Sequence, residues 1–402
     1  MKIAASGHKM SVSVNAHQIG SQKWYRQQQP PVFELNAEKI KIIDLFCGIG
    51  GLSLGAAEAC HFLAYRPEIS MAIDSSQDAI NIFKANFLSI SANIQCNDIS
   101  KIFKSSIFSE INNLENSIIK KIDKCHILIA GPPCQGHSDL NNRTRRIDDR
   151  NLLYLRAIRA AVLLKPELVI IENVPAALND HHQSIQKSAA ALTKQGYTTE
   201  LLNADLSKFG IAQSRRRLFL IGHHFTPGTF NEMYKQISIP IKTLKDTIKD
   251  LKIIDSSLFD SPSKSSPENK RRMKFMFDNN LFDLPNCHRP ACHRDKKHSY
   301  TSMYGRLDWE RPAQTITSGF GSPGQGRYIH PKEQRTLTPH EAARIQGFPD
   351  YFRFSEISFR SVLQTLIGNA VPPAASFHLV EHFLRLRRAH GQNACTNTKS
   401  SE

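Results

Sequence analysis

The sequence predicts an α/β fold in which a doubly wound, largely parallel sheet carries a smaller inserted domain. Three observations indicate this fold. Apolar runs of strand length alternate with amphipathic helical stretches between residues 40 and 223. A glycine-rich turn follows the first of these runs, as in sheets that hold a ligand at their carboxyl edge. The alternation stops between residues 224 and 305, where a polar, basic and His-rich composition indicates a separate domain.

The order of the predicted elements divides the chain into segments. The predicted strands cover residues 41–46, 71–74, 126–130, 168–172 and 217–222. Predicted helices return at residues 338–346, 361–367 and 374–388, and the first of them opens with Thr338 as its cap and Pro339 as its first position. We expect a flexible N-terminal arm at 1–38, the main domain at 39–223 and 306–390, the inserted domain at 224–305 and a flexible tail at 391–402.

The 402-residue chain is strongly basic, with 52 Lys and Arg against 36 Asp and Glu, a net charge of +16 and a pI near 9.5. This balance favours a polyanionic partner such as nucleic acid, with a solvated basic surface as the alternative. No segment approaches the roughly 18 to 20 apolar residues of a membrane span, and the first forty residues lack a signal-peptide core. We therefore expect a cytoplasmic protein without membrane contact, whose eight scattered cysteines are reduced.

The first candidate site is the turn at residues 44–55, which ends a strand and opens a helix. Its glycines let a ligand approach the backbone closely, and the N–H groups of the helix N-terminus suit a carboxylate or phosphate. The spacing is neither that of a P-loop nor that of a dinucleotide-binding turn. Asp74 and Asp98 follow later strands, where a carboxylate could bind a ribose hydroxyl or an adenine amino group, with a surface turn as the alternative.

Further polar groups lie at the ends of predicted strands: Cys134 and Glu172 follow strands at the same edge of the sheet, and Arg215 and Arg217 stand where another strand opens. Cys134 stands behind two prolines and is a candidate thiolate nucleophile, with a small buried hydrophobic residue as the alternative. Glu172 could serve as an acid toward a ring nitrogen. Arg215 and Arg217 alternate on one face of a strand, so both could reach an anionic ligand while Arg216 faces away. A solvated charge cluster is the alternative for these arginines.

Together these motifs resemble the cytosine-5 DNA methyltransferase family in both content and order. The resembling segments are residues 44–55 for its S-adenosylmethionine loop, 131–138 for its Pro-Cys loop, 172–174 for its Glu-Asn-Val signature, 213–217 for its Gln-x-Arg-x-Arg strand, 311–317 with 337–350 for the block after its recognition domain, and 368–373 for its final cofactor motif. The resemblance covers residues 40–223 and 306–390.

The resemblance implies a Rossmann-like sheet and a DNA (cytosine-5-)-methyltransferase that acts on a flipped cytosine through a covalent Cys134 adduct. Glu172 would contact N3 and the exocyclic amine, and Arg217 with Arg215 the carbonyl or nearby backbone. The family's ribose-binding Glu has Ala72 at its position here, with Asp74 as the substitute. The implied contacts to the cofactor S-adenosyl-L-methionine are Asp44, Phe46, Gly48, Gly50, Gly51, Leu52, Asp74, Asp98, Pro133, Asn369 and Val371.

By the same resemblance, residues 39–223 and 306–390 form the catalytic and cofactor-binding domain, residues 224–305 the target recognition domain, and residues 139–150 a mobile loop that closes on DNA. The candidate base-reading side chains are Arg271, Arg272, His288, Arg289, His293, Arg294 and His298. A zinc site around Cys287 and Cys292 is not favoured, because their spacing lacks a second clear ligand pair, so we expect no metal.

The expected partners are double-stranded DNA and a separately encoded cognate restriction endonuclease, with the protein acting as a monomer. Two other functions remain as alternatives. One is a tRNA cytosine-5 methyltransferase, which shares the catalytic motifs. The other is a non-catalytic DNA-binding regulator that keeps the fold, although the presence of Cys134, Glu172 and Arg217 argues against it.

Overall fold

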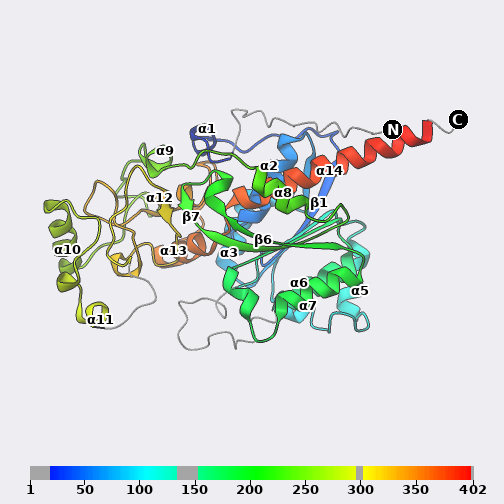
Figure 1. Ribbon diagram of the computed structural model, residues 1–402, viewed down its shortest axis with the longest axis horizontal. Helices are drawn as coiled ribbons and strands as arrows, with labels where there is room; N and C mark the ends of the chain where they lie inside the picture. Colours follow the sequence, from blue (N-terminus) through cyan, green and yellow to red (C-terminus); the bar gives the residue numbers. More distant parts are fainter. Residues whose placement is uncertain (1–18, 134–152, 296–301, 400–402) are drawn as a thin grey trace, which may run out of the picture.

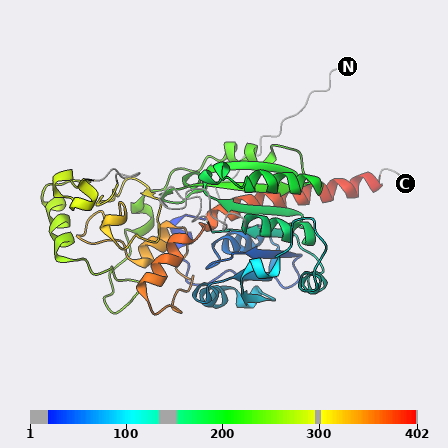
Figure 2. The same ribbon diagram turned by 90° about the horizontal axis from the view of Figure 1, so that it is seen from below.

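The computed structural model describes residues 19–133, 153–295 and 302–399, with the backbone alone from residue 392 onward. Two parts lie side by side in it (Figures 1 and 2). A layered part holds a central sheet, and a second lobe built from short helices and loops lies at one end of that sheet, opposite the free end of the C-terminal helix. The predicted α/β fold with a smaller second unit is confirmed.

The central sheet has seven strands in the order β3-β2-β1-β4-β5-β8-β6. The first five run parallel, and β8 runs antiparallel to both of its neighbours. The strands are β1 (Lys39–Leu45), β2 (Arg66–Asp74), β3 (Ile94–Cys96), β4 (Ile127–Ala130), β5 (Leu168–Asn173), β6 (Thr198–Asp205) and β8 (Arg216–His223). All five strands predicted from apolar runs are present, with ends shifted by a few residues.

Alternate residues of the central strands point into two separate cores. Ile42 and Ile127 pack into the core on one face of the sheet, together with α2, α3 and α14. Ile43 and Leu128 pack into the core on the other face, together with α4, α6 and α7. Because both faces are covered, the central strands carry consecutive apolar residues, as at Ile42 and Ile43 of β1 and Ile127 and Leu128 of β4.

The helices of the layered part connect and cover these strands. They are α2 (Gly51–Phe62), α3 (Gln77–Phe87), η1 (Leu88–Ile90), α4 (Ile99–Ile102), α5 (Asn113–Lys121), α6 (Leu153–Leu164), η3 (Pro175–Asn179), α7 (Ser184–Lys194), η4 (Leu206–Phe209), α8 (Thr229–Gln236) and α14 (Pro373–Lys399).

The second lobe has a small core of its own, centred on Met273, Met276 and Ile329. Its elements are α9 (Leu244–Ile248), α10 (Pro267–Asp278), η5 (Asn286–His288), α11 (Ala291–Arg294), η6 (Pro323–Gln325), α12 (Pro339–Ile345), α13 (Arg360–Asn369) and the two-stranded sheet of β7 (Gln213–Ser214) with β9 (Ala313–Gln314). Backbone hydrogen bonds from Arg306 to Phe282 and from Leu244 to Arg311 join its early and late segments.

The lobe boundaries therefore differ from the expected 224–305. At the start, α8 packs on the main sheet, because Phe230 is buried in the core there and its backbone N–H donates to Glu200. At the end, the lobe continues past residue 305, since Ile329 completes its core, while α12 and α13 beside it also place Ala342 and Leu363 in the core of the main sheet. A change in composition marks where the chain becomes polar. The chain passes from the core of the main sheet to the core of the lobe at different residues.

The described part of the N-terminal segment, residues 19–38, is not the flexible arm that the sequence suggested. A short helix, α1 (Gln22–Tyr25), buries Trp24 and Tyr25 to 1% exposure each. The indole N–H of Trp24 donates to the Gly347 carbonyl at 2.9 Å, and the Tyr25 carbonyl accepts from the Asp350 N–H at 2.8 Å. Two aromatic rings in a polar, Gln-rich stretch supply the apolar surface that fixes the segment onto the turn after α12.

The C-terminal tail also differs from expectation. We expected a flexible tail from residue 391, but α14 continues to Lys399. Gly391 keeps a helical backbone and does not adopt the left-handed conformation that commonly ends a helix.

Replacing Trp24 with Ala should lower the free energy of unfolding by about 3 to 5 kcal/mol, because it empties a buried site and leaves the Gly347 carbonyl without its donor. Urea unfolding curves measure this change. Val32→Ala is the matched control from the same segment, since Val32 is 87% exposed and its loss should cost under about 0.5 kcal/mol. Equal stability of the two variants would contradict the burial of Trp24.

Candidate active site

The glycine turn after β1 leaves its backbone open on one side. Phe46, Gly48 and Gly50 all have positive φ, at 58°, 53° and 92°. A Cβ at Gly50 would lie 2.3 Å from the Phe87 ring, so only glycine fits there. A Cβ at Gly48 would meet nothing within 4 Å. The turn is therefore packed from behind at Gly50 and open at Gly48, and the positive φ of Phe46, rare for an aromatic residue, is the kind of backbone strain found at ligand sites.

Asp74, the last residue of β2, holds this turn in place. Its two carboxylate oxygens accept hydrogen bonds from the backbone N–H of Gly48 at 2.9 Å and of Ser76 at 2.8 Å. Ala72, two residues earlier, is fully buried inside the sheet and pairs with Asp44 and Ile94. The strand-end carboxylate beside the turn is thus that of Asp74. The side chain of Ala72 does not reach the turn, because it is buried inside the sheet.

Asp98 lies two residues beyond the end of β3 and caps α4. Its side chain accepts hydrogen bonds from the Ser100 hydroxyl at 2.8 Å and the Ser100 N–H at 2.9 Å. These bonds hold the pKa of Asp98 below its usual value. The carboxylate is partly exposed at the same edge of the sheet as Asp74.

Asp44 is placed differently, because it is completely buried behind the turn. The Ser53 hydroxyl of α2 donates to one of its oxygens at 2.6 Å, and the other oxygen has no hydrogen-bond partner within the described residues. Burial raises the pKa of Asp44 to about 8, although the bond from Ser53 opposes this shift. Asp44 supports the turn from inside and does not line its open side.

The last part of the chain closes against this turn. A Cβ at Gly51 would lie 2.1 Å from the Val371 carbonyl oxygen, so the two backbones nearly touch. The Val371 side chain, Leu52 and the Phe46 carbonyl oxygen all lie within 4 Å of the position a Cβ would take at Gly131. Four of the predicted cofactor contacts therefore surround one small space. Asn369 ends α13 two residues before Val371 and is exposed.

A close ion pair lies at the neighbouring strand end. The Arg217 Nε is 2.7 Å from an oxygen of Glu172, and the two side chains are only 12% and 9% exposed. Glu172 belongs to β5 and Arg217 to β8, and the antiparallel pairing of Asn173 with Leu218 brings the two together. The second Glu172 oxygen accepts no hydrogen bond from the described residues. The sequence placed Glu172 at this edge, whereas it gave Arg217 only as a residue at the start of a strand.

Arg215 serves a different purpose from the one expected. Its guanidinium donates to the carbonyl oxygens of Ile316 at 3.0 Å and Ala370 at 3.3 Å, and the residue is 2% exposed. Arg215 lies between β7 and β8, so the alternation of side chains along a strand does not relate its direction to that of Arg217. Arg216 is exposed, as expected. Arg215 therefore binds the backbone that leads to Val371 and does not join Arg217 at the ion pair.

Sequence reasoning missed a buried amide pair that supports this backbone. Gln213 Nε2 donates to Gln346 Oε1 at 2.9 Å, and Gln346 Nε2 donates to the Ile367 carbonyl at 2.7 Å. Both glutamines are fully buried. Gln346 stands at the end of a predicted helix, where no local signal distinguishes a buried amide from a solvated one.

Cys134 and residues 139–150 lie outside the described residues, as does His298. Pro133 is the last described residue before them, and Pro132 is buried. The Gly131 N–H donates to the Leu45 carbonyl at 3.2 Å, so the chain leaves β4 beside the glycine turn. β4 pairs with β5 up to Ala130 and Ile171, one residue before Glu172.

Among the described residues, no group of three or more His, Cys, Asp or Glu could hold a metal ion. Cys287 and Cys292 are both exposed. In the same described part of the chain, no helix is both long and apolar enough to cross a membrane.

The model of the C-5 cytosine-specific DNA methylase family matches residues 40–385. The chain belongs to this family. The predicted activity, transfer of a methyl group to carbon 5 of cytosine in DNA, is therefore confirmed, and so are the predicted family and enzyme class.

Individual relatives agree with this assignment. The type II methyltransferase M1.BsuMI of Bacillus subtilis (strain 168) is 43% identical over 92% of this chain and 86% of its own length. The type II methyltransferase M.BsuRI of Bacillus subtilis is 26% identical over 84% of this chain and 78% of its own length.

Two solved structures share the fold. A DNA modification methyltransferase encoded within an E. coli prophage has a TM-score of 0.57 and 25% identity, covering 87% of this chain and 99% of its own. The S. pombe Dnmt2 methyltransferase has a TM-score of 0.59 and 16% identity over the same shares, which supports the fold alone.

The buried Asp44 should make the protein less stable as the pH rises. The folded chain keeps a proton on Asp44 up to about pH 8, while the unfolded chain releases it near the ordinary pKa of 3.8, so the free energy of unfolding falls across that window. Asp44→Asn should remove this part of the pH dependence and be more stable than the wild type at pH 8, as measured by urea unfolding at pH 5 and pH 8.

Asp123→Asn is the control, because the Asp123 side chain is 78% exposed and its pKa is lowered, chiefly by its hydrogen bond to Lys41. This substitution should leave the change between pH 5 and pH 8 as in the wild type. An Asp44→Asn variant with the wild-type pH dependence would show that Asp44 is ionised in the folded protein at neutral pH.

Proposed function

We propose that this DNA cytosine-5 methyltransferase binds a flipped cytosine at the Glu172–Arg217 pair, attacks it with Cys134 and uses S-adenosyl-L-methionine as the methyl donor. The observation that carries the proposal is the nearly buried ion pair at the carboxyl end of β5, one strand away from the segment that leads to Cys134. A base inside a duplex cannot reach such a pair, so the target nucleotide must leave the helix.

Glu172 and Arg217 suit the polar edge of cytosine. One Glu172 oxygen is held by Arg217, and the other has no partner among the described residues. That oxygen is available to accept from the exocyclic amine or to share a proton with N3. Arg217 fixes the carboxylate and supplies positive charge beside the cytosine carbonyl, where negative charge develops once the ring is attacked.

Cys134 supplies the covalent step. Carbon 5 of cytosine is a weak nucleophile, so the thiolate first forms a bond to carbon 6, and the ring electrons make carbon 5 an enamine carbon. Carbon 5 then takes the methyl group, and the carbon–sulfur bond of the donor breaks with its electron pair on sulfur. Loss of the carbon 5 proton to a base restores the double bond and expels the Cys134 thiolate.

The residues around the glycine turn fit S-adenosyl-L-methionine, which supplies an electrophilic methyl group when bound. Gly48 leaves its side of the turn open, and Asp74 presents a carboxylate to that side, as a ribose would require. Leu52 and Val371 form an apolar wall beside Gly131. Phe46 and Asp98 would contact the adenine, and Asn369 the methionine end. Pro133 follows Gly131, which borders this space, and directly precedes Cys134 in the sequence.

The second lobe is proposed to recognise the target sequence in double-stranded DNA. The basic composition and the exposed arginines of α10 and α11 support this. The similarity to M1.BsuMI, a type II methyltransferase, supports a role beside a separately encoded restriction endonuclease. We further propose that the enzyme acts in the cytoplasm as a monomer, since one active site suffices for one flipped base.

Transfer of labelled methyl from S-adenosyl-L-methionine to unmethylated bacterial DNA and, separately, to tRNA tests the proposal. Wild-type protein should label DNA alone, as 5-methylcytosine, and Cys134→Ala should reduce the rate roughly 10⁴-fold or more by removing the nucleophile. Cys125→Ala is the matched control, because Cys125 lies just before the opposite end of β4, and it should keep the wild-type rate.

Each contrary result identifies the statement that fails. Labelling of tRNA alone would show that tRNA and not DNA is the substrate, as the tRNA methyltransferase alternative requires. Undiminished labelling of DNA by Cys134→Ala would overturn the covalent mechanism. DNA binding without any labelling by the wild type would favour the non-catalytic regulator.

A further inference from the structure

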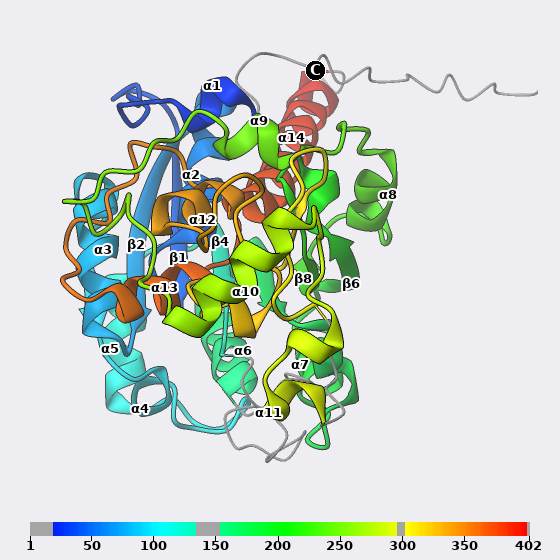
Figure 3. The same ribbon diagram turned by 90° about the vertical axis from the view of Figure 1, so that its left-hand side faces the viewer.

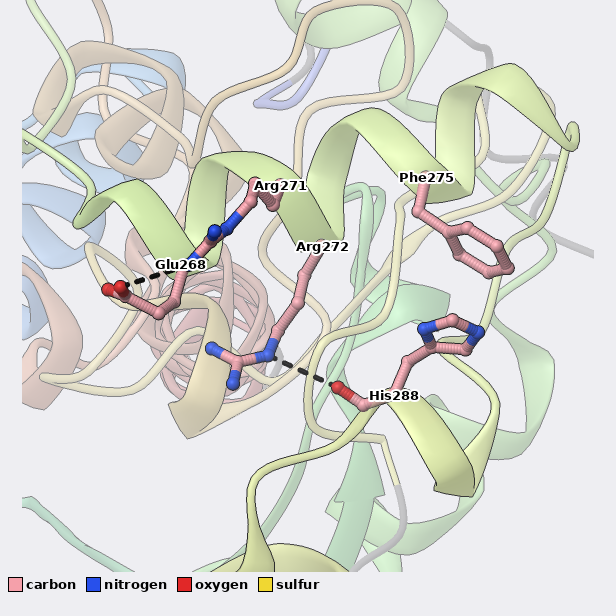
Figure 4. Close-up of a pocket in the computed structure, with 5 residues that line it drawn as sticks. All are labelled: Glu268, Arg271, Arg272, Phe275 and His288. Carbon is pink, nitrogen blue, oxygen red and sulfur yellow. Dashed lines mark hydrogen bonds and ion pairs between the residues drawn. The ribbon is translucent and has the colours of Figure 1, made fainter.

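The second lobe carries a charged hollow on α10 that the catalytic site does not use. It is lined by Glu268, Arg271, Arg272, Phe275 and His288 (Figure 4). The first four come from α10 at a helical spacing of three or four residues, so they share one face of the helix. Met273 and Met276 point into the lobe core instead. The hollow is therefore a surface that α10 presents outward while its other face anchors it.

Arg272 is held in a fixed orientation within this hollow. Its Nε donates to the His288 carbonyl at 3.2 Å, and its Nη1 donates to Asn269 Oδ1 at 2.9 Å. Its guanidinium also lies 5.6 Å from the centre of the Tyr304 ring. Nη2 donates to no described residue. A planar fork that is already ordered loses little conformational entropy when it binds a second partner.

Arg271 stands beside it with much less restraint. Its side chain is 76% exposed, and its ion pair is with Glu268, one turn earlier, at 3.2 Å. An exposed pair of this kind contributes about 0.2 to 1 kcal/mol, so another acceptor can replace it easily. Arg271 thus adds an adjustable fork next to the fixed fork of Arg272.

The floor of the hollow is an aromatic stack. The His288 ring lies 3.9 Å from the Phe275 ring, centre to centre, at an interplanar angle of 29°. This stack fixes His288, whose carbonyl in turn orients Arg272. The hollow therefore has a rigid base and two arginine forks at its rim.

The hollow adjoins η5 and α11, and its position relative to the layered part can be followed in two views. Figures 1 and 3 both place α11, which follows the hollow's His288, on the side where α6 and α7 lie. α6 follows the Cys134 segment in the sequence, and α7 follows Glu172 through η3. A duplex that delivers a base to Glu172 from this side extends toward α11 and α10.

We propose, on the basis of the function proposed above, that this face of α10 reads guanines of the target sequence in the major groove, with Arg271 and Arg272 each donating to the O6 and N7 of one guanine. The major groove is about 12 Å wide and admits a helix, and an arginine fork matches the two guanine acceptors. Glu268 accepts from the amino group of a cytosine in the same or the adjacent base pair.

The presence of Glu268 also indicates whether the two arginines bind a base or a backbone phosphate. A carboxylate at the rim repels phosphate but matches a cytosine amino group, which is a donor. A fork fixed in one orientation, as in Arg272, is needed to select one base edge, while charge alone suffices for a phosphate. The mixed charge of the hollow therefore favours base reading.

The test compares methylation motifs in the full-length enzyme. Wild-type protein, Arg271→Lys and Arg272→Lys each methylate unmethylated bacterial genomic DNA, and bisulfite sequencing gives the preference at every position around the modified cytosine. Lysine keeps the charge but loses the fork, so a phosphate contact survives and a two-point guanine contact does not. Lys274→Ala is the control on another face of α10, where Lys274 pairs with Asp278.

We expect the wild type to require a guanine at two positions. Each lysine variant should accept other bases at one of them, with the preference for guanine there reduced roughly 10- to 100-fold. All other positions, and the Lys274→Ala motif, should stay as in the wild type. Arg271→Lys preserves the fold, since that side chain is 76% exposed. Unchanged motifs in both lysine variants, or a rate reduced equally on all sequences, would overturn the inference. A wild type that deposits no 5-methylcytosine would overturn the proposed function instead.

Discussion

The arrangement of the whole site depends on one close backbone approach between the two ends of the ordered chain. Gly51 and Gly55 of α2 lie against the carbonyl oxygens of Val371 and Pro373, so that a Cβ at either glycine would be about 2 Å from a carbonyl oxygen. Any side chain there would push the start of α14 away from the first turn. Because these glycines allow contact, the last cofactor motif forms one wall of the same space as the first.

Several buried polar contacts then fix that returning segment. Arg215 and Gln346 both donate to the carbonyl of Ala370, the residue before Val371. Gln346 is itself bonded to Gln213, which begins β7. Buried donors without acceptors cost about 1 to 3 kcal/mol each, so this network tolerates few alternative positions. The motif around Gln213 therefore holds the segment that leads to Val371 through Arg215 and pairs with Glu172 through Arg217.

The reversed direction of β8 explains how Glu172 and Arg217 meet. Five parallel strands bring their carboxyl ends to one edge, and a sixth parallel strand would place its first residues at the opposite edge. β8 runs antiparallel to β5, so its beginning, where Arg217 lies, reaches the end of β5, where Glu172 lies. An ion pair between strand ends is thus available at the edge where the cofactor turn also opens.

The sequence predicted those features that depend on short-range pattern. The runs that became β1, β4 and β5 carry consecutive apolar residues at their centres because both faces of the sheet are covered, and such runs are easily recognised. The polar edge strand β6 (Thr198–Asp205) escaped, since its buried positions include the charged Glu200 and its exposed positions include Leu201, so apolar residues do not follow the burial pattern. The glycine turn, Asp74 and Glu172 end or follow parallel strands, so their common edge could be inferred, whereas the place of Arg217 depends on the reversed direction of β8.

Features that depend on contacts distant in sequence could not be predicted. Trp24 is bonded to Gly347, more than three hundred residues away, and its polar surroundings indicated an arm. Arg215 looked equivalent to Arg217, and only the carbonyls of Ile316 and Ala370 distinguish it. The lobe boundary was placed by composition, although Phe230 joins the sheet and Ile329 joins the lobe.

The most direct test of the account is covalent capture of the wild-type protein on DNA that carries 5-fluorocytosine, with S-adenosyl-L-methionine present. Fluorine at carbon 5 cannot leave as a proton does, so a Cys134 thiolate that has added to carbon 6 cannot be expelled after methylation. The account predicts a complex that survives denaturation and whose cross-linked peptide contains Cys134. Full methylation of ordinary cytosine by the same preparation, with no complex on the fluorinated DNA, would contradict it.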